Sequence, residues 1–243
     1  MGTSSSRSDI NSSRGGAWSD AKRRTTSFIR ETGSSARSAL ESFALAVRDD
    51  EIKSGARGGG GRLSTSVKAG QGLGSFFGDV ISGGLDQALR SAGLGNLIGA
   101  SPSTVLSALV DYICGDGSLL NDVVARSAAV EVLAEIFDEN DETYDDLRER
   151  WDIHLDKDLI TKLLSLFLAQ SIFQIFLIEL GSKFEGNNLS AKEAAQKEKE
   201  IYELLKEIIK FDLGKIDPLK FNWKGRQGQL LIKRNLDLAI SQL

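Results

Sequence analysis

The residue types that most often carry chemistry are scarce in this sequence. The chain of 243 residues contains one histidine, His154, and one cysteine, Cys114. A zinc site draws several ligands from cysteine and histidine, and a cysteine nucleophile needs a base beside it. One residue of each type cannot build either site without ligands from outside the chain. We therefore expect no metal, no cofactor and no catalytic residue, and we do not expect an enzyme.

Two stretches approach known ligand-binding patterns, and each fails at a defining position. An EF-hand register that starts at Asp138 places oxygen ligands at the spacing that calcium needs, but Thr143 stands where the loop requires glycine. The spacing of Gly70, Gly72 and Gly74 is not that of the G-x-G-x-x-G dinucleotide motif, and no strand precedes it. The sequence favours a solvated acidic loop and a packed helix at these places.

The N-terminal stretch "MGTSSS" offers a different chemistry. A small residue after Met1 permits removal of the initiator methionine, which would leave the free amine of Gly2. Gly2 and Ser6 also fit the short M-G-x-x-x-[ST] pattern of N-myristoylation. Residues 2–6 are therefore the start of a flexible tail, a lipid site or a handle for another enzyme.

Charge is unevenly distributed along the chain. Residues 1–68 hold 12 basic and 7 acidic side chains, a net charge of +5, although the whole chain carries −4. Such a basic lead could fold back on the acidic body, recruit an acidic partner or contact nucleic acid, and the simplest interpretation is a soluble, disordered tail. The basic residues available for phosphate contacts are Lys22, Arg23, Arg24, Arg30 and Arg37. The absence of a recognisable binding module and the acidic body disfavour a nucleic-acid partner.

Composition divides the chain into two parts. Residues 1–35 are rich in serine, glycine and arginine without visible periodicity, and we expect them to be disordered, with Trp18 as either an anchor for a partner or a stray aromatic of the tail. Residues 36–243 are expected to form one all-α, bundle-like domain, interrupted by a flexible glycine-rich hinge at 55–62.

The elements of this domain are marked by periodicity and caps. Apolar residues from Leu40 to Val47 follow helical spacing, and Gly70, Gly74 and Gly78 form a ridge that permits close packing. Ser101-Pro102 predicts a helix start, and Ser190 to Glu193 is a capping box. A terminal helix after Pro218 would close the core or dock on a partner. Alternating strand patterns are nearly absent.

The most apolar stretch is Leu159–Leu180. Its 22 residues would span about 33 Å as a helix, long enough to cross a bilayer. Polar residues are spread around it and no basic flank frames it, so we expect a central core helix and disfavour a membrane span. The N-terminus lacks the apolar region of a secretory signal, and we expect a cytoplasmic protein.

Several motifs together resemble one family. "MGTSSS", "GARGGGGR", "LGNLIG" and above all "DYICGDGSLLNDVVAR" look like the QatB proteins of bacterial Qat anti-phage defence systems. The similarity runs over most of the chain and is clearest at Met1–Ser6 and Ala36–Val132, whereas the acidic and C-terminal segments match only in helical character.

The resemblance implies a four-component operon whose other members are an ATPase, a QueC-like enzyme (QatC) and a TatD-like nuclease. In related defence systems, QueC-like enzymes join a deazaguanine nucleobase to an N-terminal glycine of a partner. Carried to this sequence, Gly2 would be the acceptor, and Thr3, Ser4, Ser5 and Ser6 the segment that the enzyme recognises. Two alternatives remain: a membrane-associated or pore-like effector that uses residues 159–180, and a nucleic-acid adaptor that uses the basic tail.

Overall fold

The computed structural model describes residues 16–30, 34–56, 63–115, 120–137, 142–185, 189–213, 217, 222–223 and 225–241. Every regular element in these ranges is a helix, which confirms the predicted all-α class. The α-helices are α2 (Gly16–Ile29), α3 (Ala36–Ala56), α4 (Ser64–Ser91), α5 (Pro102–Cys114), α6 (Leu120–Ala134), α7 (Tyr144–His154), α8 (Lys157–Leu180), α9 (Ser182–Glu185), α10 (Ala191–Leu213) and α11 (Arg226–Ser241). A short 3-10 turn, η1 (Gly95–Leu97), follows α4.

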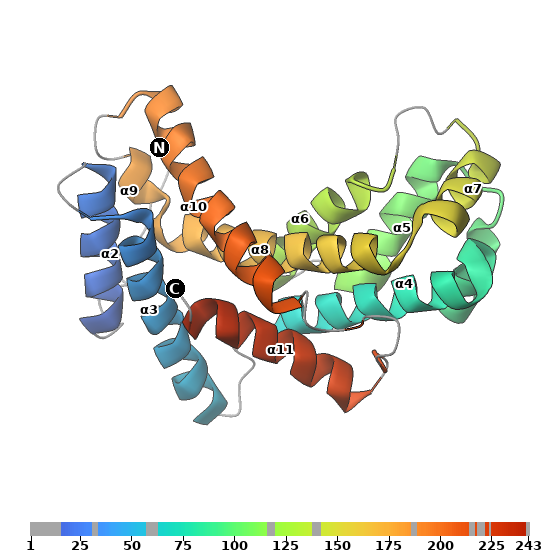
Figure 1. Cartoon of the computed structure of the whole chain (residues 1–243), viewed down its shortest axis with the longest axis horizontal. Helices are drawn as coiled ribbons and strands as arrows, with labels where there is room; N and C mark the ends of the chain where they lie inside the picture. Colours follow the sequence, from blue (N-terminus) through green and yellow to red (C-terminus); the bar gives the residue numbers. More distant parts are fainter. Residues whose placement is uncertain are drawn as a thin grey trace, which may run out of the picture.

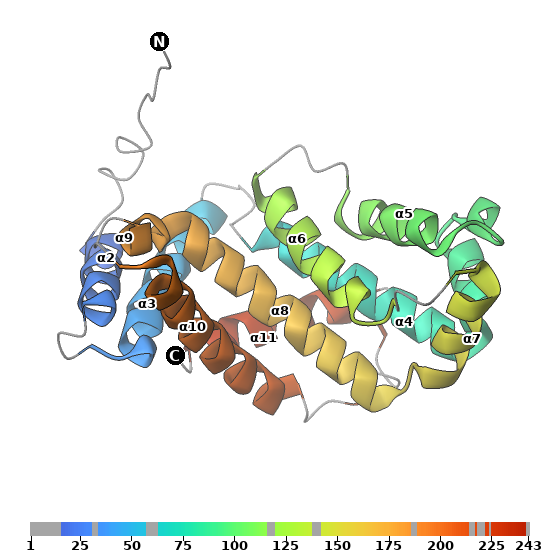
Figure 2. The same ribbon diagram turned by 90° about the horizontal axis from the view of Figure 1, so that it is seen from above.

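The helices share one apolar core along an elongated body. Helices α2 and α3 lie at one end of the long axis and α7 lies at the other, as Figure 1 shows. Helix α8 runs between the two ends and packs against α6 and α10 (Figure 2). Because it contacts both halves, α8 positions the N-terminal helices relative to the rest of the bundle.

Helix α8 is the core helix that its composition predicts. Its start is set by Asp156, whose Oδ1 accepts a hydrogen bond from the Leu159 backbone N–H at 2.8 Å. Phe167 and Phe176 are fully buried in its middle and last turns. Its most apolar 18-residue window is long and apolar enough to cross a membrane, yet 72% of that window is buried inside the protein. The apolar surface that would face lipid is therefore used for packing.

The glycine ridge of α4 is a packing surface, as predicted. The ring of Trp223 lies so close to Gly74 that an added Cβ would stand 2.5 Å from the ring carbon Cδ2. One turn earlier, a Cβ at Gly70 would approach Ile232 of α11 at 3.1 Å. Ile232 is itself fully buried, so α11 closes the core at this point. Glycine lowers the stability of a helix, and the packing of these two bulky side chains against the ridge offsets that cost.

Helix α4 changes direction at Gly84, a feature that periodicity did not predict. Gly84 has a φ of 78°, in the region that favours glycine, and the helix resumes after it. The freed backbone N–H of Leu85 donates to Oδ1 of Asp152 at 2.8 Å. Asp152 belongs to α7, so the second part of α4 is capped by a side chain 67 residues later in the sequence.

Local start and stop signals elsewhere are confirmed. Helix α5 begins at Pro102 with Ser101 as N-cap and ends at Cys114, and the C-cap residue Gly115 has a φ of 77° that suits glycine. Helix α10 begins with the predicted capping box, in which the Ser190 backbone N–H donates to the Glu193 carboxylate and the Glu193 backbone N–H donates to the Ser190 hydroxyl. The box satisfies amide groups that a helix end would otherwise leave unpaired.

Two boundaries predicted from composition are wrong. Residues 16–29, expected to be disordered, form α2, because five buried side chains on one face supply packing that a serine- and arginine-rich composition concealed. Residues 55 and 56, expected to open the hinge, belong to α3. The rest of that predicted hinge, 57–62, lies outside the described residues.

Candidate functional site

The predicted recognition segment, Gly2 to Ser6, lies outside the described residues. Its attachment to the body is described, because the chain enters α2 at Gly16. The part of the site that the structure describes is therefore the packing of α2 against the body, which determines where the N-terminal segment starts.

Helix α2 is amphipathic, and it packs mainly on α3 (Figure 1). Its buried residues are Trp18, Ala21, Thr25, Phe28 and Ile29. Their spacing of three, four, three and one residues places them on one face of a 3.6-residue helix. This periodicity was the signal that sequence reasoning missed.

Trp18 is a core residue, which corrects its interpretation as an anchor for a partner. Its side chain is 2% exposed and packs edge-on against Phe43 of α3, with ring centroids 6.1 Å apart. Phe43 in turn contacts Phe176 of α8 at 5.3 Å, and Phe176 contacts Phe184 of α9 at 6.2 Å. This chain of aromatic rings links the first turn of α2 to the central helix. Each edge-to-face pair stabilises the contact beyond the effect of burying apolar area.

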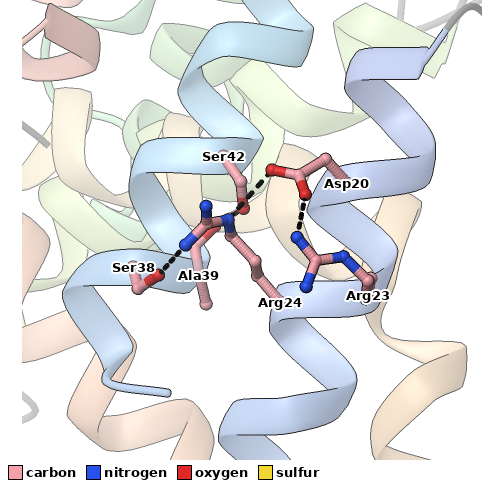
Figure 3. Close-up of polar contacts among 6 residues, drawn as sticks. All are labelled: Asp20, Arg23, Arg24, Ser38, Ala39 and Ser42. Atoms are coloured by element: carbon pink, nitrogen blue, oxygen red, sulfur yellow. Dashed lines mark hydrogen bonds and ion pairs between the residues drawn. The ribbon is translucent and has the colours of Figure 1, made fainter.

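Polar contacts fix the orientation of α2 on α3 (Figure 3). Nε of Arg24 donates to Asp20 at 2.9 Å, and Nη1 of the same guanidinium donates to Oγ of Ser38 at 2.7 Å. Arg23 also bonds Asp20. Hydrogen bonds from Arg23 and Arg24 lower the pKa of Asp20. Arg24 thus connects the two helices.

The opposite face of α2 lines a basic hollow. The hollow has a volume of about 410 Å³ and is lined by Lys22, Arg23, Thr26, Ser27 and Arg30 of α2 and Lys183 of α9. We call it the α2–α9 hollow. Three of the five basic residues singled out in the sequence meet there, whereas Arg24 faces α3 and Arg37 does not line it. Lys183 was missed, because no local pattern connects it with α2.

The single histidine and cysteine form no site together. His154 is exposed at the last residue of α7, and Cys114 is buried at the end of α5. Burial raises the pKa of the Cys114 thiol to about 12, so the reactive thiolate is scarce at neutral pH. Within the described ranges, no group of three or more His, Cys, Asp or Glu is placed to hold a metal ion.

The acidic stretch around α7 is used for capping. Thr143 and Asp146 form a capping box, in which Oδ2 of Asp146 accepts from the Thr143 backbone N–H at 2.9 Å. Those hydrogen bonds lower the pKa of Asp146. Asp146, which stands at a ligand position of the EF-hand register, therefore caps the start of a helix. Residues 138–141 of that register lie outside the described residues.

Comparison with known proteins identifies the family of this chain. A family model described as "Qat anti-phage system associated protein QatB" matches residues 54–243. The match reaches the C-terminal residue, so the acidic and C-terminal segments resemble the family more specifically than their helical character suggested. Met1–Ser6, α2 and most of α3 lie before the matched range. No curated protein and no solved structure matches the chain.

Proposed function

Since the chain belongs to the QatB family and is a component of the Qat anti-phage defence system, we propose that it is a non-catalytic subunit that presents its N-terminal glycine to a QueC-like partner. The helical body assembles with that partner. Gly2 is the acceptor of a group that the partner transfers, and Thr3 to Ser6 are the residues that the partner recognises.

The docking of α2 is the observation that supports this proposal most. Trp18 and Arg24 hold α2 on α3, so the preceding segment starts from a defined place on the body. The 14 residues from Gly2 to Gly15 can span at most about 50 Å, since each residue extends by no more than about 3.6 Å. That length is enough for the terminal amine to enter an active site on another protein while α2 stays docked.

The chemistry of Gly2 suits an acceptor. An α-amine has a reference pKa of about 7.7–8.0, so a substantial fraction is neutral and nucleophilic near neutral pH. Glycine has no side chain to hinder attack. The amine nitrogen would bond to a carbon of the nucleobase and lose a proton, and the leaving group on that carbon would depart within the partner enzyme.

The proposal places catalysis on the partner polypeptide. The ATPase and the TatD-like nuclease that the family resemblance implies are further candidates for assembly with the body. Association with other Qat components follows from membership in the system, and which of them binds directly is part of the proposal.

Co-purification tests the proposal. The full chain carrying a C-terminal tag is co-expressed with the QueC-like protein, alongside a variant that lacks residues 3–6 and a control that lacks residues 11–14. The control shortens the segment equally and keeps "MGTSSS". We expect the full chain and the control to retain the partner and the 3–6 deletion to lose it. Equal retention of the partner by all three proteins would show that residues 3–6 are not needed for recognition.

A further inference from the structure

A small cavity lies where α6, α8 and α10 meet. We propose that it binds a guanidinium group, carried by a small guanidino compound or by an arginine side chain of another polypeptide. The inference goes beyond the proposed function, because it concerns a site on the folded body and requires neither Gly2 nor the QueC-like partner.

The cavity forms because α8 lies between α6 and α10 and packs against both (Figure 2). Its lining comes from all three helices: Glu131, Val132 and Glu135 of α6, Leu166 and Gln170 of α8, and Tyr202 and Lys206 of α10. Its volume is about 130 Å³. This volume equals that of about four water molecules at about 30 Å³ each, which suits the central carbon and the nitrogens of a guanidinium group.

Gln170 contributes a buried acceptor that lacks a donor. Its side chain lines the cavity, the residue is 7% exposed, and its Oε1 has no hydrogen-bond partner among the described residues. An unpaired buried amide oxygen is costly, and native proteins satisfy most such atoms. The amide can turn about its last torsion to direct this oxygen at a bound group, because its oxygen and nitrogen are nearly interchangeable in shape. A ligand that donates hydrogen bonds in the cavity would remove the cost.

Glu131 contributes a carboxylate that the protein engages weakly. It accepts a hydrogen bond from the Tyr202 hydroxyl at 3.4 Å, which is long for a bond between these two groups. Burial raises the pKa of Tyr202, and the nearby charge of Glu131 adds to the rise, so the hydroxyl stays protonated. The Tyr202 ring packs on Phe173 of α8 with centroids 5.1 Å apart, which fixes it beside the cavity. The carboxylate therefore keeps most of its acceptor capacity for a ligand.

The other charged groups of the lining are engaged in ion pairs with residues outside it. Glu135 pairs with Lys162 of α8 at 2.9 Å, and Lys206 pairs with Glu203 one turn earlier on α10 at 3.2 Å. These pairs balance one negative and one positive group of the lining. Glu131 is the carboxylate of the described lining that stands outside these pairs, so it is the counter-ion that the cavity offers to a cation.

A guanidinium group suits these acceptors better than a primary ammonium group. It is planar, carries its N–H donors in a fixed fork and can bind a carboxylate through two hydrogen bonds at once. Its remaining donors are available to the Gln170 oxygen while the fork binds Glu131. It is also more weakly hydrated than an ammonium group, so it tolerates the apolar Val132 and Leu166 side chains as neighbours.

The test uses the full-length protein and three probes: ethylguanidinium, ethylammonium and N-acetyl-arginine N-methylamide. Binding is measured by shifts in two-dimensional amide NMR spectra, up to tens of millimolar probe at constant ionic strength. Glu131→Gln removes the charge, and Gln170→Leu replaces the amide with an apolar group of similar size. The matched control is Glu41→Gln, at an exposed carboxylate of α3 that does not line the cavity. Thermal melts check that the variants are folded.

We expect ethylguanidinium to bind, and ethylammonium to bind about fivefold more weakly because it forms fewer simultaneous hydrogen bonds. Glu131→Gln should weaken ethylguanidinium binding about tenfold through loss of a charge-assisted hydrogen bond, and Gln170→Leu about fivefold through loss of a neutral one. Glu41→Gln should stay within about twofold of wild type, since exposed charges at this distance are largely screened.

Two readouts locate the ligand at Gln170. The side-chain amide signal of Gln170 is identified by its absence from the Gln170→Leu spectrum, and we expect it to shift when ethylguanidinium binds. Gln170→Leu should melt at the same temperature as wild type or higher, because it removes the unpaired buried oxygen. A weaker ligand contact in a variant of undiminished stability separates binding from a structural role.

The two guanidinium probes distinguish the sources of the group. Tighter binding of N-acetyl-arginine N-methylamide would identify an arginine side chain of a polypeptide, because that probe carries the flanking peptide groups. Tighter binding of ethylguanidinium would identify a small guanidino compound, because the peptide groups then hinder entry.

Three results would overturn the inference. The first is no saturable shift with either guanidinium probe. The second is equal affinity for ethylguanidinium and ethylammonium, which would show that the cavity does not select the guanidinium group. The third is equal weakening by Glu131→Gln and Glu41→Gln, which would indicate diffuse attraction by net charge. None of these results depends on whether Gly2 is modified.

Discussion

The indole Nε1 of Trp18 donates a hydrogen bond to Oδ2 of Asp50 over 3.1 Å, which joins the first turn of α2 to the C-terminal part of α3. The ring of Trp18 packs on Phe43 at the same time. Arg24 makes the corresponding link between the middle of α2 and Ser38 near the start of α3. Helices α2 and α3 therefore form an antiparallel pair that keeps the N-terminal segment attached to one end of the bundle.

Replacing Trp18 should release α2. Trp18→Ala removes a buried ring, and such truncations cost about 3–5 kcal/mol. We expect faster tryptic cleavage within α2 and a lower unfolding free energy in urea. Trp18→Phe keeps an aromatic ring and loses only the hydrogen bond to Asp50, at a cost of about 1 kcal/mol. An unchanged cleavage rate in Trp18→Ala would contradict the docking described for α2.

The glycine ridge of α4 predicts opposite effects at neighbouring positions. In Gly74→Ala the new Cβ would lie 2.5 Å from Trp223, and we expect a destabilisation of about 1–3 kcal/mol from overpacking. In Gly78→Ala the Cβ would meet Trp223 at an ordinary 3.7 Å, and alanine is the better helix former by up to about 1 kcal/mol. Gly78→Ala should therefore be neutral or stabilising. Urea melts measure both, and equal effects would argue against the close approach of Trp223.

The bend in α4 predicts a dependence on Asp152. Asp152→Ala leaves the Leu85 N–H without its acceptor, and loss of a comparable cap costs about 0.5–2 kcal/mol. Asp152→Asn keeps a side-chain oxygen and should recover most of that loss. Thermal melts of the two variants provide the comparison. If Asp152→Asn were as destabilised as Asp152→Ala, charge rather than the hydrogen bond would be the source of the effect.

The buried thiol predicts slow alkylation and a loss of stability at high pH. The pKa of Cys114 is raised by burial to about 12 in the folded protein, against about 8.5 for a free cysteine. Burial disfavours the charged thiolate, so folding favours the neutral thiol over the thiolate. This contribution is fully present below the unfolded pKa and is lost as pH rises from about 8.5 towards 12.

Iodoacetamide labelling at pH 8 measures this protection. We expect alkylation of Cys114 to be at least tenfold slower in buffer than in concentrated urea. Comparable rates in the two solutions would mean that the end of α5 opens readily and that the thiol is not protected.

Local signals explain which parts of the fold could be predicted. The caps at Ser101 and Ser190 act within a few residues, so their sequence patterns suffice. The Gly70, Gly74 and Gly78 spacing indicated close packing, although it did not identify Trp223 and Ile232 as the neighbours. The apolar density of 159–180 indicated burial, because only a central helix can place so many apolar side chains in a core.

The features that were missed depend on contacts between distant segments. The apolar face of α2 is sparse, and its burial depends on packing against α3. The bend at Gly84 is stabilised by Asp152, and the basic hollow needs Lys183, which lies 161 positions after Lys22 in the sequence. The proposed role of Gly2 comes from its chemistry and from the family resemblance, and it stays a prediction.

The mass of the N-terminal peptide tests the central proposal most directly. The full chain is purified after expression with and without the QueC-like partner, digested, and analysed by tandem mass spectrometry. The account predicts a partner-dependent mass increase that fragment ions assign to the Gly2 amine, and its absence when the partner is omitted. A Gly2 peptide of unmodified mass under both conditions, together with failure of the two proteins to co-purify, would contradict it.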